Sequence, residues 1–86
     1  MNNIVYSKKN FNVYKMSNNQ FIVHNINKDF KHGHTHVNNF NTAKYIVNMA
    51  YHKSFPEKRI SKWLLESIIR VSENKAYINI LRELQK

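Results

Sequence analysis

Residues 21–47 read FIVHNINKDFKHGHTHVNNFNTAKYIV, and the hydrophobic pattern changes its period once within this stretch. Before the histidines, apolar residues occupy every second position, as Phe21 and Val23 do, which is the period of a half-buried strand. After them, residues such as Ala43 and Ile46 follow the spacing of a helix. The stretch therefore predicts that strands lie before residue 40 and helices after it.

The same alternation extends back to the N-terminus in two further segments, which contain Ile4 and Tyr6 and then Phe11 and Val13. Polar residues separate the segments, and Asn18-Asn19 can supply the positive φ of a tight hairpin. Residues 4–25 are thus predicted to form a three-stranded antiparallel meander. Residues 25–39 have no sustained period and are predicted to form a histidine-rich loop or a short irregular strand.

The rest of the chain has the pattern of three α-helices, which makes the fold class α+β. Asn41 or Thr42 can cap the first helix, Pro56 separates it from the second, and Ser72 can cap the third. His52 falls on the outer face of the first helix with Tyr45 and Met49, and Phe55 belongs to the connection. The predicted core faces are Ala43, Ile46, Val47 and Ala50; Ile60, Leu64, Ser67, Ile68 and Val71, widened by Trp63 and Leu65; and Tyr77, Ile80, Leu81 and Leu84.

The length of 86 residues predicts a single domain over residues 1–86, with a small core and marginal stability. The chain has no cysteine, so disulfides and thiolate zinc sites are excluded. No stretch approaches the ~20 apolar residues that span a bilayer, and no signal-peptide pattern is present. We therefore expect a cytoplasmic protein with no membrane partner, and its oligomeric state stays open.

Three histidines alternate within residues 32–36 (HGHTH). In extended backbone, positions i and i+2 lie on one face about 6.5 to 7 Å apart, so two such imidazoles can bind one ion. All three can bind it only if the backbone bends, and Gly33 makes a bend least costly. The segment predicts one structural zinc ion per chain; the alternative is a polar loop without an ion. The candidate metal ligands are His24, His32, His34, His36 and His52, with Asp29 or water as a further ligand.

Basic side chains gather around Pro56. With 14 Lys and Arg against 5 Asp and Glu, the formal net charge is +9, which favours an anionic partner. The alternative is a solvated basic face that only keeps the protein soluble. The candidate partner-binding residues are Lys53, Lys58, Arg59 and Lys62.

Catalysis is a weaker interpretation. The chain has no Cys nucleophile, and its single glycine, Gly33, excludes a glycine-flanked serine elbow or a phosphate loop. A hydrolase whose metal is held by His34 and His36, with Asp29 or Glu57 as general base, remains conceivable. Because 86 residues barely form one hydrophobic core, they leave little chain for a pocket that encloses a substrate. A structural ion explains the histidines without such a pocket, and we expect no enzymatic activity.

Four segments carry a resemblance to known proteins: residues 21–25 (FIVHN), 30–36 (FKHGHTH), 42–46 (TAKYI) and 64–72 (LLESIIRVS). The most specific parts are the GHTH core and the LLxSxxRxS pattern of the second helix. Together the segments resemble small proteins of phages and prophages of Gram-positive bacteria. Some members of this group are similar to anti-CRISPR inhibitors of type II RNA-guided nucleases, including zinc-containing ones, and the GHTH match implies His34 and His36 as zinc ligands.

The resemblance implies a non-enzymatic phage protein that binds a type II CRISPR effector nuclease and blocks target DNA loading or cleavage. A chain with a charge of +9 cannot imitate DNA with an acidic surface. It would instead press on an acidic patch of the effector, for example in the helical recognition lobe, or grip the guide RNA. The alternative function is direct binding of nucleic acid by a basic phage protein.

Overall fold

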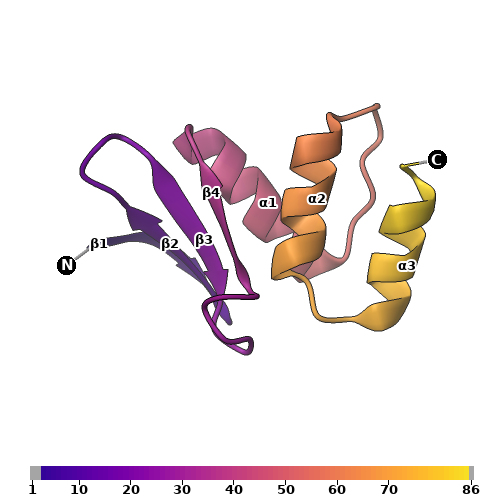
Figure 1. Cartoon of the computed structure of the whole chain (residues 1–86), viewed down its shortest axis with the longest axis horizontal. Coiled ribbons are helices and arrows are strands. Elements are labelled where there is room, and N and C mark those ends of the chain that lie inside the picture. The colour runs from indigo at the N-terminus through magenta and orange to yellow at the C-terminus, as the bar shows by residue number, and fades with distance from the viewer. Residues whose placement is uncertain (1–2, 86) are drawn as a thin grey trace.

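The computed structural model describes residues 3–85 and confirms the α+β class: an antiparallel sheet comes first, and three helices follow it (Figure 1). The sheet has the order β1-β2-β3-β4, so each strand pairs with its neighbour in sequence. None of the helices in residues 3–85 is long and apolar enough to cross a membrane. The elements are β1 (Asn3–Lys8), β2 (Phe11–Lys15), β3 (Phe21–Asn25), β4 (His34–Val37), α1 (Phe40–His52), α2 (Lys62–Val71) and α3 (Lys75–Glu83).

The sheet has four strands rather than the predicted three, because residues 34–37 pair with β3. Thr35 and Val37 of β4 are buried on the helical side, where Thr35 Oγ1 lies 2.9 Å from Ser67 Oγ of α2. This contact also explains why a polar Ser67 occupies the core face of α2. The loop prediction was therefore wrong for these four residues, and the alternative of a short strand was right.

Alternation along the strands divides the sheet into two faces. Val13, Val23 and Thr35 lie opposite one another on β2, β3 and β4 and point into the core. The core is closed by α1 and α2, which pack against this face, while α3 packs against α2 on the far side (Figure 1). The opposite face of the sheet is open and carries Asn12, Tyr14, Ile22, His24, His34 and His36.

The helix caps differ from those predicted. Asn39, not Asn41 or Thr42, caps α1, because its side chain accepts from the Thr42 amide at 3.1 Å. Ser72 ends α2, and Asn74 caps α3. The positive φ predicted for the Asn18-Asn19 turn is confirmed at Asn19.

The predicted core faces are confirmed for α1 and in part for α2 and α3. Ala43, Ile46, Val47 and Ala50 are buried, and Met49 is buried with them rather than exposed beside Tyr45. Ile60 precedes α2, which begins at Lys62, and Trp63 is exposed instead of widening the core face. In α3, Tyr77 and Leu81 are buried, but Ile80 and Leu84 are about half exposed, because no element covers the outer side of this last helix.

Candidate functional site

Three of the five candidate histidines lie together on the open face of the sheet. His24 of β3 is directly opposite His34 of β4, and His36 follows two residues later on the same face. The ring centroids of His34 and His36 are 5.0 Å apart. The predicted pair of histidines at positions i and i+2, His34 and His36, is therefore present. The third histidine, His24, comes from the adjacent strand, so the backbone does not need to bend to bring it close.

Two of these rings have one nitrogen engaged by a backbone carbonyl. His24 Nε2 donates to the Lys28 carbonyl at 3.1 Å, and His34 Nδ1 donates to the Phe30 carbonyl. Because a carbonyl only accepts, each neutral ring keeps a lone pair on its other nitrogen. A carbonyl on the second nitrogen is the common arrangement around metal-binding histidines.

The ring of Phe30 covers this pair. It stacks on His34 with centroids 4.0 Å apart and meets His24 edge-on at 5.2 Å. Within residues 3–85, no three His, Asp or Glu side chains converge on one point as metal ligands. A shared ion would therefore need rotation of the imidazoles and displacement of the Phe30 ring, which no helix in residues 3–85 holds in place.

The other two histidines lie elsewhere. His32 Nδ1 is 2.8 Å from Asp29 Oδ2, and its ring lines a hollow together with Trp63 and Ser67 of α2. His52 ends α1, where Lys8 Nζ donates to its Nε2 at 3.2 Å. Lys8 belongs to β1, the edge strand farthest from β4, so His52 is not part of the histidine cluster. We call His24, His34 and His36 the histidine face.

The strand that carries two of these histidines is held by α2. Arg70 Nε donates to the His34 carbonyl at 2.7 Å, and its Nη2 donates to the Lys31 carbonyl at 3.0 Å. From the loop, Lys28 Nζ donates to the Arg70 and Ser72 carbonyls at 3.0 Å each. The backbone around the histidine face is thus fixed by contacts to a helix, although its side chains face away from that helix.

Electrostatics favour a neutral imidazole at His36. Partial burial, followed by electrostatic contributions from His34 and Arg70, lowers the pKa of His36 below its ordinary value of 6.5. At neutral pH the ring is therefore uncharged, which is the form of histidine that serves as a metal ligand.

Gly33 does not act as the predicted bend. Its φ is not positive, so another residue could adopt its backbone conformation. The reason for glycine is proximity: a Cβ at this position would lie 2.5 Å from Lys28 Cβ and 3.2 Å from the Asp29 carbonyl oxygen. Residues 28 and 29 of the loop before β4 approach Gly33 so closely that only a hydrogen atom fits in place of a side chain at residue 33.

The four candidate partner-binding residues separate into two places. Lys53 follows α1 in the left-handed conformation and lines a hollow that also contains Asn25 and Glu73. The other three lie on the interhelical connection (residues 54–61) or directly after it. Lys58, Arg59 and Lys62 are all exposed.

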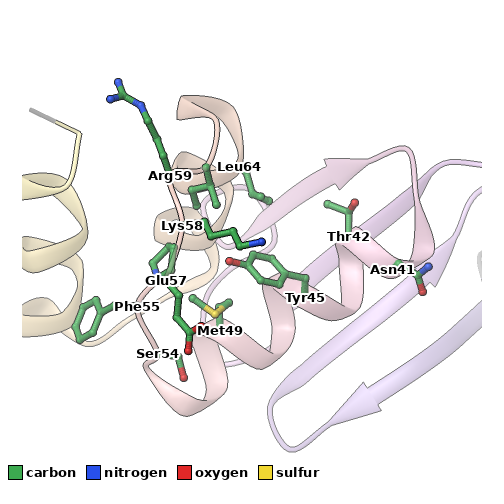
Figure 2. A pocket seen from close by; sticks show the side chains of 12 residues that line it. Asn41, Thr42, Tyr45, Met49, Ser54, Phe55, Glu57, Lys58, Arg59 and Leu64 are labelled. Atoms are coloured by element: carbon green, nitrogen blue, oxygen red, sulfur yellow. The ribbon is translucent and has the colours of Figure 1, made fainter.

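Lys58 and Arg59 form part of one wall of a groove between α1 and the interhelical connection (Figure 2). The groove has a volume of about 660 Å³, within the range of about 300–1,000 Å³ that is usual for ligand sites. In Figure 2 the side chain of Lys58 extends across the groove on the side of Tyr45, whereas Arg59 points away from it. We call this site the basic groove; its lining is Asn41, Thr42, Tyr45, Met49, Ser54, Phe55, Pro56, Glu57, Lys58, Arg59, Ile60 and Leu64.

Tyr77 of α3 helps to position this groove, a role that the helical periodicity of the sequence could not predict. Its buried hydroxyl group can donate to the Ser54 carbonyl at 2.7 Å or to the Met49 carbonyl at 3.1 Å. Its ring lies 5.3 Å from that of Phe55, and burial raises the pKa of Tyr77 to about 12. Tyr77 thereby fixes the start of the interhelical connection. The only sequence signal was a tyrosine at a core position, where a hydroxyl group needs a partner.

Comparison of the chain with protein-family models, curated proteins and solved structures found no match.

Proposed function

We propose that this chain is a non-enzymatic, zinc-carrying phage protein that inhibits a type II CRISPR effector nuclease in the cytoplasm of the bacterial host. The observation that carries the proposal is the histidine face. His34 and His36, the two residues implied as zinc ligands by the resemblance to anti-CRISPR proteins, lie on one face of β4 beside His24.

Strand geometry supports a site for one ion. Opposed residues on antiparallel strands have Cβ atoms about 4.5 to 5.5 Å apart, and diagonal neighbours about 7 to 8 Å. With His34 and His36 about 6.5 to 7 Å apart along the strand, the three Cβ atoms form a triangle of the size that imidazoles can bridge. The lone pairs left on His24 and His34 by their carbonyl partners fit the same role.

The ion would link two strands in a chain that is too small for a large core. Three histidine ligands leave a fourth position, which on this open face would be filled by water. His32 and His52, which lie outside the histidine face, are not ligands in this proposal.

The zinc site can be tested with histidine variants, in which His32 and His52 serve as the controls. Protein purified without added metal should carry about one zinc per chain by elemental analysis, and zinc should raise its melting temperature. His24→Ala, His34→Ala and His36→Ala should each lower the zinc content, whereas His32→Ala and His52→Ala should retain it. Metal-free wild type whose stability does not respond to zinc or to a chelator would contradict the zinc site.

The inhibitory function is tested by target-DNA cleavage with a panel of assembled type II effectors. We expect wild type to block cleavage by at least one of them at a stoichiometric dose, and His34→Ala to need a higher dose because its fold is less stable. DNA or RNA incubated with the protein and divalent ions alone should stay intact. If no effector is inhibited while the chain binds free nucleic acid tightly, the alternative of a nucleic-acid-binding phage protein replaces this one.

A further inference from the structure

We propose that the basic groove is the docking site for an acidic, amphipathic segment of the partner protein, with an apolar side chain inserted between α1 and the interhelical connection. The inference rests on the proposed function only for the identity of the partner. The groove, its charges and its apolar lining are separate from the histidine face, which lies on the other side of the sheet.

The lining calls for an apolar anchor. Tyr45 and Phe55 expose 36% and 43% of their surface and line the groove together with the half-buried Leu64 and the buried Met49. Contiguous exposed apolar surface of this kind marks an interaction site. Met49 is only 9% exposed, but its flexible and polarizable side chain can adjust to an inserted group.

The groove exists before any partner arrives. Because the Tyr77 hydroxyl group can donate to the Ser54 carbonyl or to the Met49 carbonyl, the start of the connection is held against the end of α1. Pro56 further restricts the backbone there. The groove therefore loses little conformational entropy when a partner binds, which favours binding.

Charge selects an acidic partner. Lys58 and Arg59 stand in one wall, and Lys62 lines a second hollow on the opposite side of the same connection, which also includes Lys58 and Arg59. These three cations outnumber Glu57, which lines both hollows, in a chain whose net charge is +9, so the rim of the groove favours an acidic segment.

The same lining disfavours nucleic acid. Glu57 lies in the groove near Met49 and Ser54, so one anion accompanies the Lys58 cation there, while Arg59 points away (Figure 2). Affinity for a phosphate backbone comes from many cations, and single strands need a series of stacking rings. A peptide that combines a few carboxylates with one apolar anchor matches a site that is mostly apolar and modestly positive.

The test uses NMR amide shifts of the isotope-labelled full chain with three probes. The first is a peptide with leucine and tryptophan anchors among glutamates, the second has lysines in place of the glutamates, and the third is oligo(dT). We expect the acidic peptide alone to shift amides around Tyr45, Met49 and Lys58. Shifts spread over the whole basic surface, or equal shifts with oligo(dT), would overturn the proposal.

Matched variants separate position from overall charge. Lys58→Glu with Arg59→Glu should weaken peptide binding at least about tenfold, because like charges would then face the peptide. Lys15→Glu with Lys31→Glu changes the net charge equally at exposed positions outside the groove and should bind nearly as wild type does. Equal loss in both pairs would contradict a groove-specific contact.

Failure of the groove proposal can be distinguished from failure of the proposed function. If the peptide maps to the groove but no effector is inhibited, the docking site stands and the proposed partner is wrong. If an effector is inhibited and Lys58→Glu with Arg59→Glu inhibits at the wild-type dose, the groove proposal is wrong and the function stands.

Discussion

Gly33 illustrates how one residue can be necessary for a reason that its neighbours in sequence do not reveal. Its position among alternating histidines indicates a bend, yet its backbone is one that any residue could adopt. The constraint comes from Lys28, five residues earlier, whose Cβ occupies the space that a side chain at residue 33 would need. The loop that presents His34 is therefore built on a close backbone approach.

Gly33→Ala should destabilise the protein by about 1–3 kcal/mol, the usual cost of overpacking a site that cannot expand freely. For a domain of this size, each kcal/mol corresponds to about 4–8 °C in melting temperature, so calorimetry or circular dichroism will resolve the change. Lys31→Ala, at an exposed position of the same loop, is the matched control and should stay within about 0.5 kcal/mol of wild type. An unchanged melting temperature for Gly33→Ala would refute the close approach.

Among the elements, the junction between α2 and α3 is tied to the sheet by a polar network. Asn25, fully buried at the end of β3, donates to Glu73 Oε2 at 2.8 Å and to the Val71 carbonyl at 2.9 Å. Asn27 donates to the same carboxylate at 3.1 Å. Hydrogen bonds from Asn25 and Asn27, with smaller contributions from the charges of Lys28 and Lys53, hold the pKa of Glu73 below its ordinary value of 4.5.

This network predicts a pH dependence with a definite sign. Because the folded-state pKa of Glu73 is lowered, its contribution to stability is present above pH 4.5 and is lost as the pH falls through the folded-state pKa. Glu73→Gln should therefore be less stable than wild type at pH 7, and the difference should shrink in acid. Denaturant unfolding across this range measures it, and Asn27→Ala should reduce the same difference in part. A Glu73→Gln deficit that does not change between pH 7 and pH 3 would contradict the assignment.

Periodicity was sufficient for β1, β2, β3 and the core face of α1, because those elements alternate or repeat over enough residues. It failed at β4, where only Thr35 and Val37 face the core and the alternate positions are histidines. It also failed at the caps, since Asn39 and Asn41 are the same residue type and only the position of the first helical turn decides between them. The basic groove depends on Tyr77 reaching Met49 and Ser54, which are 28 and 23 residues away in sequence, and no local pattern reports such a contact.

At the scale of the whole molecule, two sites occupy opposite sides of the core. In residues 3–85 the helices lie on one side of the sheet only (Figure 1). The histidine face lies on the other side of the sheet, and the basic groove lies among the helices. A structural ion at the first would stabilise β3 and β4 without contacting the second. We therefore propose that the histidine face serves stability, that the basic groove serves recognition, and that the recognised partner is a protein rather than a nucleic acid.

Fluorescence anisotropy of the labelled chain tests that claim most directly, with an assembled type II effector, its guide RNA alone and naked duplex as binding partners over a series of salt concentrations. We expect saturable one-to-one binding to the effector, weakened by Lys58→Glu with Arg59→Glu, and little binding to the guide RNA or duplex at physiological salt. Tight binding to naked duplex, falling with salt at a slope of about −0.9 per phosphate neutralised and indifferent to the effector, would contradict it.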